Sequence, residues 1–451
     1  MYPFTLHAKA WAIALIALGL SSCGGGGGGS TASTPLYAIG GSVSGLPSGQ
    51  SITLQNSDGS NLSITANGSF TLNATQASGS SYSVSVLTQA STKTCIVMNA
   101  SGTVANANIS NITVSCVSPT RFAYVANFGT NDVSAFTVNT TTGALTEVSS
   151  SRFAAGTNPG AIVIDPTVQF VYVANNGSND VSAYSINAAT GALIPVTGSP
   201  FAVGANPDAL AVDPSGKFLY VANQSANSLS ALAINTTTGA LTTIAGSPYA
   251  TGSSPDSVAI DPSGKYLYVV NLNSGSASAF SINASTGALA SIGGSPFWLA
   301  GTGGMAISPA NNFAYIGGLA ANAVAAESID ATTGALSAIS GSPFAAGTYP
   351  NAVAIDPTGK FVYATNLSSN NISGYAANGS TGTLTAMSGS PFSSGAAPVA
   401  LAIDAAGRFA YVVNANNSNI AVFNINASTG VLTSTGNTYA TGSGPQSIAM
   451  R

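Results

Sequence analysis

Six copies of a 47- or 48-residue unit and a shorter seventh predict that this 451-residue chain is all-β, with a seven-bladed β-propeller of four strands per blade preceded by a small β-sandwich. Two further observations favour this fold class. Only 5% of the residues are charged, so few Glu/Lys pairs are present to stabilise helices. Apolar and polar residues also alternate over short runs rich in Thr, Val and Ser, which is typical of half-buried strands.

The first 22 residues have the layout of a secretory signal peptide. His7 and Lys9 precede an apolar run from Ala10 to Leu20, which small residues follow. The run has about half of the ~20 apolar residues that span a bilayer, so a retained transmembrane helix is the weaker interpretation.

Leu20-Ser21-Ser22-Cys23 resembles the bacterial lipobox. The resemblance implies that Cys23 is lipidated after cleavage and that the Gly- and Ser-rich residues 23–35 form a tether. The protein would then be membrane-anchored in a bacterial cell envelope, at the outer membrane or the cell surface. Ordinary secretion with an unpaired Cys23 is the alternative.

Residues 36–118 predict the β-sandwich, since residues 51–55, 61–65, 69–72, 82–86 and 111–115 alternate with a period of two. Asn67-Gly68 predicts a two-residue hairpin turn between two of these strands. Cys95 and Cys116, the other two cysteines, would face an oxidising compartment after export, which predicts one disulfide. Two cysteines without histidine cannot complete a zinc shell, so we predict no metal site.

Residues 119–451 contain the repeats that predict the propeller. Phe122-Ala-Tyr-Val-Ala-Asn127 returns in variant form at Phe170, Phe218, Tyr266, Phe313, Phe361 and Phe409. Stretches such as Asp213-Pro-Ser-Gly-Lys217 fit turns between strands, where the acid accepts backbone N–H bonds. The last repeat, residues 409–451, lacks the turn that leads to a next strand, which predicts that the C-terminal strand completes the N-terminal blade.

The Tyr-Val-Ala-Asn and Asp-Pro-Ser-Gly-Lys-Phe-Leu-Tyr-Val motifs resemble the YVTN repeat of the lactonase-like, 6-phosphogluconolactonase-type, seven-bladed propellers. The resemblance implies the fold, but the family's activities differ. In the enzymes, Arg and His commonly follow the Pro that opens the innermost strand. The equivalent residues in this chain include neither type: Gly160, Asp208, Asp256, Gly304, Asn351, Val399 and Gln446.

The only histidine, His7, lies in the signal segment, so the mature chain has no imidazole for acid–base work near neutral pH. We therefore predict a lipid-anchored binding or cell-surface scaffold protein without catalytic residues or cofactors. The alternative is a divergent lactonase-like hydrolase of the 6-phosphogluconolactonase type that acts on a sugar lactone.

Small polar residues at the start of the innermost strands are the candidate ligand-binding residues: Asn158, Asn206, Asp208, Asp256, Asn351 and Gln446. They could bind a carbohydrate, a peptide or another envelope protein. The competing interpretation is that they only satisfy backbone groups of the loops.

Nucleic acid is excluded as a partner, because the basic residues are scattered singly and the net charge is −4. Glu147, Glu327 and Asp330 are predicted to be solvated charges on outer strands. Trp298 lies in the most divergent repeat, the fifth, and marks either a ligand notch or a drifted blade in which a large side chain fills a gap. We favour the drifted blade.

Overall fold

The computed structural model describes residues 34–88, 90, 94–117 and 121–451, so Cys23 and the predicted signal peptide lie outside the described residues. The chain divides into two compact units, Met1–Pro119 and Thr120–Arg451, each described here by itself. Among the described residues, no helix is long and apolar enough to cross a membrane.

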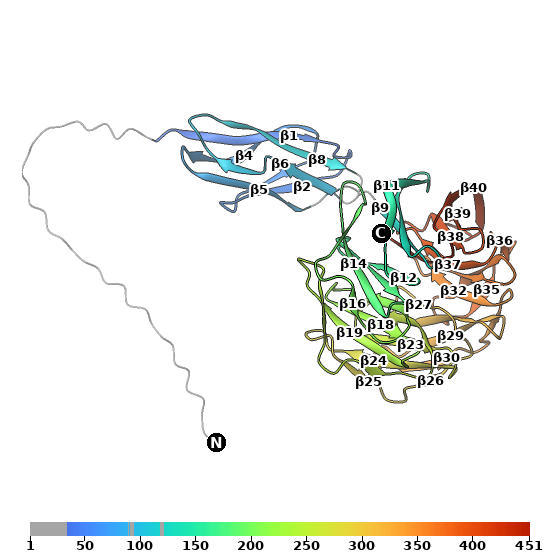
Figure 1. Ribbon diagram of the computed structural model, residues 1–451. Coiled ribbons are helices and arrows are strands. Elements are labelled where there is room, and N and C mark those ends of the chain that lie inside the picture. Colours follow the sequence, from blue (N-terminus) through green and yellow to red (C-terminus); the bar gives the residue numbers. More distant parts are fainter. Residues whose placement is uncertain (1–33, 89, 91–93, 118–120) are drawn as a thin grey trace, which may run out of the picture. The chain divides into compact units, whose positions relative to one another are not determined.

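The first unit consists of two four-stranded sheets in the orders β4-β1-β8-β6 and β3-β2-β5-β7 (Figure 1). The strands are β1 (Leu36–Ser44), β2 (Ile52–Asn56), β3 (Asn61–Ile64), β4 (Gly68–Ala77), β5 (Ser81–Thr88), β6 (Thr94–Met98), β7 (Ser101–Thr103) and β8 (Ile109–Val117). Ile39 and Val114 of one sheet join Leu54 and Val84 of the other in one buried apolar cluster. The two sheets therefore pack face to face.

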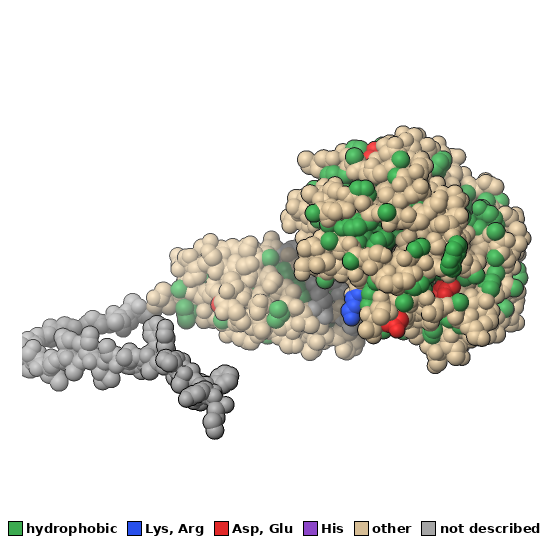
Figure 2. Space-filling view, turned by 90° about the horizontal axis from the view of Figure 1, so that it is seen from below, with side chains coloured by type: hydrophobic (Ala, Val, Ile, Leu, Met, Phe, Trp, Pro, Cys, Tyr) green, Lys and Arg blue, Asp and Glu red, His purple; other side chains and the backbone are tan. Residues whose placement is uncertain are grey.

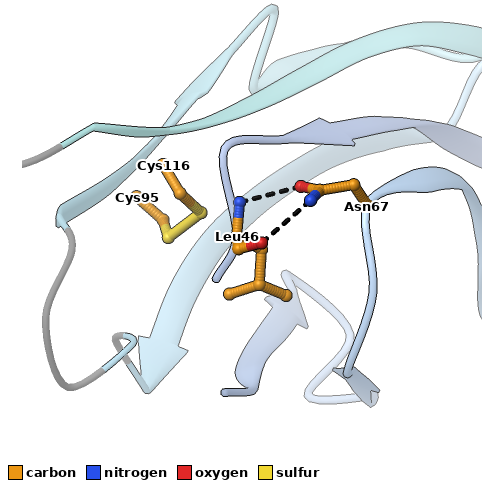
Figure 3. Close-up of a disulfide and its surroundings, with 4 residues drawn as sticks. All are labelled: Leu46, Asn67, Cys95 and Cys116. Carbon is orange, nitrogen blue, oxygen red and sulfur yellow. Dashed lines mark hydrogen bonds between the residues drawn. A yellow bond between two sulfur atoms is a disulfide. The ribbon is translucent and has the colours of Figure 1, made fainter. Parts of the chain in front are cut away.

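The prediction of a hairpin turn at Asn67-Gly68 is wrong, because β3 and β4 lie in different sheets. The Asn67 side chain instead pairs with the backbone of Leu46, whose N–H donates to Oδ1 and whose carbonyl accepts from Nδ2, both at 2.8 Å (Figure 3). The amide satisfies one residue's donor and acceptor as a neighbouring strand would. Asn67 thus anchors the loop after β1 where the chain crosses between the sheets.

A disulfide joins Cys95 of β6 to Cys116 of β8, as the sequence predicts. Both residues are buried in the sandwich cluster. Because the bond closes a loop across 21 positions, replacing both cysteines by Ser should lower the free energy of unfolding of this unit by about 3 kcal/mol. Chemical denaturation can measure the change, with the propeller transition as an internal control, and an unmoved sandwich transition would contradict the prediction.

The second unit is the propeller, whose blades surround a common centre. The innermost strands are β41 (Pro445–Met450), β12 (Pro159–Ile164), β17 (Pro207–Val212), β22 (Pro255–Ile260), β27 (Met305–Ile307), β32 (Pro350–Ile355) and β37 (Pro398–Ile403). The second strands are β9 (Arg121–Asn127), β13 (Phe170–Asn175), β18 (Phe218–Asn223), β23 (Tyr266–Asn271), β28 (Phe313–Gly318), β33 (Phe361–Asn366) and β38 (Phe409–Asn414).

The third strands are β10 (Asp132–Val138), β14 (Asp180–Ile186), β19 (Ser228–Ile234), β24 (Ser276–Ile282), β29 (Ala323–Ile329), β34 (Asn371–Ala377) and β39 (Asn419–Ile425). The outermost strand is continuous in the first and last blades, as β11 (Leu145–Ala154) and β40 (Leu432–Ala440). In the other blades it is divided into β15 (Leu193–Pro195) and β16 (Phe201–Ala202), β20 (Leu241–Thr243) and β21 (Tyr249–Ala250), β25 (Leu289–Ser291) and β26 (Phe297–Trp298), β30 (Leu336–Ala338) and β31 (Phe344–Ala345), and β35 (Leu384–Ala386) and β36 (Phe392–Ser393).

The C-terminal strand β41 pairs with β9 and completes the first blade. A tyrosine on each second strand links its blade to the next blade around the ring. For example, the Tyr124 hydroxyl of the first blade donates to the Gly191 carbonyl of the second at 2.8 Å. The last of these bonds runs from Tyr411 back to the Gly143 carbonyl of the first blade, at 3.0 Å. A buried apolar cluster also fills each interface between neighbouring blades, including that between the seventh and the first.

The predicted turn acids cap the turns between the innermost and second strands. Asp213 is buried, and its Oδ1 accepts the N–H groups of Lys217 at 2.8 Å and Phe218 at 2.7 Å. Asp165, Asp261, Asp356 and Asp404 accept backbone N–H bonds at the equivalent turns. All five acids therefore have a structural role, which the sequence predicted for Asp213, Asp261 and Asp356.

Candidate functional site

The candidate site lies where the innermost strands begin, at one mouth of the propeller. In six blades the residue after the opening Pro is the extra residue of a β-bulge, which removes it from the regular ladder with the second strand. A bulge redirects the side chain of the extra residue and is common next to functional sites. These residues are Gly160, Asp208, Asp256, Asn351, Val399 and Gln446.

Asp208 and Asp256 come together, because their strands β17 and β22 are neighbours in the ring of innermost strands. The two half-buried carboxyl groups share a hydrogen bond. The Gln224 side chain bridges them, with Nε2 at 3.4 Å from Oδ2 of Asp208 and 3.3 Å from Oδ1 of Asp256. Asn176 Nδ2 donates to Oδ1 of Asp208 at 3.2 Å. Two carboxyl groups and two amides thus form one connected group.

The two carboxyl groups cannot both ionise easily at this separation. Burial, the charge of Asp208 and the shared hydrogen bond raise the pKa of Asp256 to about 7. Burial also raises the pKa of Asp208, although hydrogen bonds from Asp256 and Asn176 oppose the change. The two carboxyl groups therefore titrate as one pair, which keeps a proton up to about pH 7.

Gly160, in the preceding blade, leaves room for the Asp208 carboxylate. It holds the position equivalent to Asp208, and a Cβ added there would lie only 3.3 Å from Oδ1 of Asp208. A side chain at residue 160 would therefore crowd the carboxylate on the side from which Asn176 approaches.

The other four predicted residues bond to neighbouring loops or strands, or make no bond among the described residues. Asn158 and Asn206 donate from Nδ2 to the carbonyls of Phe128 and Asn176, each at 3.1 Å, and Asn206 also donates from Nδ2 to Oδ1 of Asn176 at 3.0 Å. Asn351 donates to the carbonyl of Val399 at 2.9 Å. Gln446 is half-buried at the start of β41 and has no side-chain hydrogen bond within the described part of the chain.

Asn176 and Gln224 are functional candidates that the sequence analysis missed. Each directly follows the Asn that ends a second strand. The Asn176 N–H donates to the carbonyl of Asn158, and the Gln224 N–H donates to the carbonyl of Asn206. Aligning the seven repeats would have revealed them, because this position holds Phe128, Leu272, Leu319, Leu367 or Ala415 in the other blades.

The prediction of a solvated Glu327 is wrong. The residue is only 2% exposed, on the third strand of its blade, and burial raises the pKa of its carboxyl to about 7. Phe280 and Tyr375 hold the equivalent place in the neighbouring blades, opposite the second residue of the second strand. The carboxyl therefore occupies a position that other blades fill with a large aromatic or aliphatic side chain.

Glu147 and Asp330 are exposed, as predicted. Asp330 accepts the N–H groups of Thr332 and Thr333 in a turn. The interpretation of Trp298 as a gap-filling side chain is wrong, because this residue is 83% exposed on β26.

The comparisons with known proteins agree with this fold. Residues 78–207, 194–300 and 299–450 match the family described as lactonase, 7-bladed beta-propeller. The chain belongs to this lactonase-like seven-bladed propeller family, as its repeats predict. No curated protein matches the chain.

Solved structures show the same architecture. A putative 6-phosphogluconolactonase from Bacteroides uniformis is 22% identical with a TM-score of 0.66, and the alignment covers 74% of this chain and 100% of that one. One from Bacteroides fragilis is 23% identical with a TM-score of 0.64, covering 74% and 98%. The periplasmic gluconolactonase of Pseudomonas aeruginosa is 18% identical with a TM-score of 0.62, covering 73% and 98%. At these identities the similarity establishes the fold alone.

Proposed function

We propose that this protein hydrolyses a lactone, with Asp208 and Asp256 as its acid–base pair. The observation that carries the proposal is the bridged, proton-sharing carboxyl pair at one mouth of the propeller. Membership of the lactonase family supports this alternative over a non-catalytic scaffold. Sugar lactones are the first class to test, because the solved relatives carry the names of gluconolactonases.

The pair can perform both proton transfers without histidine. Ionised Asp208 takes a proton from a water molecule as the water oxygen bonds to the lactone carbonyl carbon, while Asp256 donates its proton to the carbonyl oxygen. The bond from this carbon to the ring oxygen then breaks, and the ring oxygen keeps the electron pair and takes the proton from Asp208. The re-formed carbonyl returns its proton to Asp256, and a hydroxy acid leaves.

Asn176 and Gln224 position the pair in this scheme. The Asn176 amide donates to Asp208 and favours its ionised form, whereas the Gln224 amide contacts both carboxyl groups and lowers the pKa of Asp256, a smaller effect than the burial that raises it. Asp256 then remains the group that carries the proton. Export and lipidation at Cys23 stay predictions from the sequence.

Catalysis by this pair requires a bell-shaped dependence of kcat/KM on pH. Activity should fall above about pH 7, as Asp256 loses its proton, and should fall again in acid, as Asp208 gains one. The measurement is acid release from a set of δ-lactones by the purified protein, corrected for spontaneous hydrolysis. No rate above the spontaneous one for any lactone, or an unchanged rate well above pH 7, would contradict the proposal.

A further inference from the structure

The cations of the propeller lie far from the carboxyl pair. Lys217, Lys265, Lys360 and Arg408 occupy the same position in four blades, at the end of the turn that follows the innermost strand. That turn begins at Asp213, five residues beyond Asp208, and the intervening strand spans about 16 Å at about 3.3 Å per residue. These cations therefore lie at the opposite mouth.

Arg152 does not supply a charge to the pair either. It lies 3.6 Å from the Asp132 carboxylate and donates to the Thr441 carbonyl at 2.7 Å. Within the described part of the chain, no Lys or Arg bonds to Asp208 or Asp256. Charged side chains are also isolated spots on the face that Figure 2 shows. A phosphate group at the site would be repelled by the ionised carboxylate, and no bonded Lys or Arg of the described residues would offset that repulsion.

Apolar side chains occupy the positions equivalent to Asn176 and Gln224 in the next three blades, beginning with the blade that contains Asp256. They are Leu272, Leu319 and Leu367. The backbone confirms the equivalence, since the Leu272 and Leu367 N–H groups donate to the Ser254 and Tyr349 carbonyls at 2.8 and 2.9 Å. Leu319 is buried, so we call the half-buried Leu272 and Leu367 together with the exposed Tyr349 the apolar arc.

Tyr349 is unusual in this arc. Its φ of 61° is left-handed, as is the φ of the smaller residues Asn158, Asn206, Ser254 and Ala397 at the equivalent place in other blades, and bulky residues rarely adopt this conformation. Its side chain is nevertheless 39% exposed rather than buried in a core. Strained residues of this kind concentrate at ligand-binding sites.

We infer that the site takes an uncharged lactone with an apolar substituent, whose ester group lies at Asp208 and Asp256 and whose substituent lies along the apolar arc. The inference rests on the proposed lactone hydrolysis and narrows its substrate class. The hydrogen-bonding half of the mouth suits the polar ester, and the apolar half suits an alkyl chain that leaves water.

Four substrates test the inference: δ-decalactone with its alkyl chain, unsubstituted δ-valerolactone, glucono-δ-lactone and 6-phosphoglucono-δ-lactone. The expected kcat/KM is tenfold or more higher for δ-decalactone than for δ-valerolactone, and lowest for the phosphorylated lactone. If either sugar lactone had the highest kcat/KM, or if δ-decalactone and δ-valerolactone had equal values, the inference about the apolar substituent would be wrong while the proposed lactone hydrolysis would stand. No turnover of any of the four would overturn the proposed function itself.

Matched variants locate the preference. Leu272→Gln and Leu367→Gln should each lower the ratio of kcat/KM for δ-decalactone over δ-valerolactone about fivefold. Ile194→Gln, which changes an exposed apolar residue on the outer strand β15, should leave the ratio unchanged. Thermal unfolding of each variant verifies that it is folded. An unchanged ratio in both folded leucine variants would overturn the role of the apolar arc.

Discussion

Replacing Asp256 by Asn should lower kcat for lactone hydrolysis by about 10²- to 10⁴-fold, the usual contribution of a positioned acid or base. Asn keeps the size of the side chain and can still donate to Asp208, but it cannot give a proton to the carbonyl oxygen. Asp208→Asn should cost a similar factor, because it removes the acceptor for the proton of the attacking water. Steady-state kinetics near pH 6.5, below the pKa of Asp256 of about 7, measures both losses.

Stability separates a loss of chemistry from a loss of folding in this experiment. The folded protein holds the Asp256 proton more tightly than the unfolded chain does, so this group stabilises the protein in acid and loses that contribution as pH rises through about 7. Asp256→Asn should therefore unfold at an equal or higher denaturant concentration than the wild type at pH 8. Asp330→Asn, at an exposed turn of the fifth blade, should keep the wild-type kcat. Wild-type activity in a folded Asp256→Asn protein would remove the pair from the mechanism.

The repeats made the propeller predictable because each level of the sequence agrees with the same fold. The apolar second strands and the turn acids recur with the period of a blade, and β41 pairs with β9 to complete the first blade. The turn at Asn67-Gly68 was predicted wrongly because a local turn signal does not specify which sheet the chain enters next. There the amide of Asn67 bonds to Leu46, 21 residues away, and this tertiary contact overrides the local preference.

The candidate site was only partly predictable. The sequence placed Asp208 and Asp256 at equivalent positions of adjacent repeats, but their contact depends on how closely neighbouring innermost strands approach. The bridging roles of Asn176 and Gln224 depend on the same distance. Glu327 was misjudged because alternation alone does not reveal which face of a third strand meets the preceding blade. Comparison with Phe280 and Tyr375 supplies that information.

Replacing Glu327 by Gln should raise the free energy of unfolding at pH 8 by about 1–3 kcal/mol. Burial raises the pKa of this carboxyl from 4.5 to about 7, so the folded state favours the protonated form. The contribution of a protonated Glu327 to stability is complete below pH 4.5 and is lost as pH rises through about 7. The advantage of Gln should therefore be largest at pH 8 and nearly absent at pH 4.5.

Chemical denaturation of both proteins at several pH values measures this difference directly. Subtracting the two curves cancels the contribution of Asp208 and Asp256, which changes with pH in the same direction. Glu147→Gln is the matched control at an exposed site, where Oε1 of Gln can still accept the Ser151 hydroxyl. Glu327→Phe should stabilise the protein at both pH values, since it restores the aromatic ring that Phe280 and Phe423 supply in their blades. A gain for Glu327→Gln that does not depend on pH would show that ionisation of the buried carboxyl is not its cause.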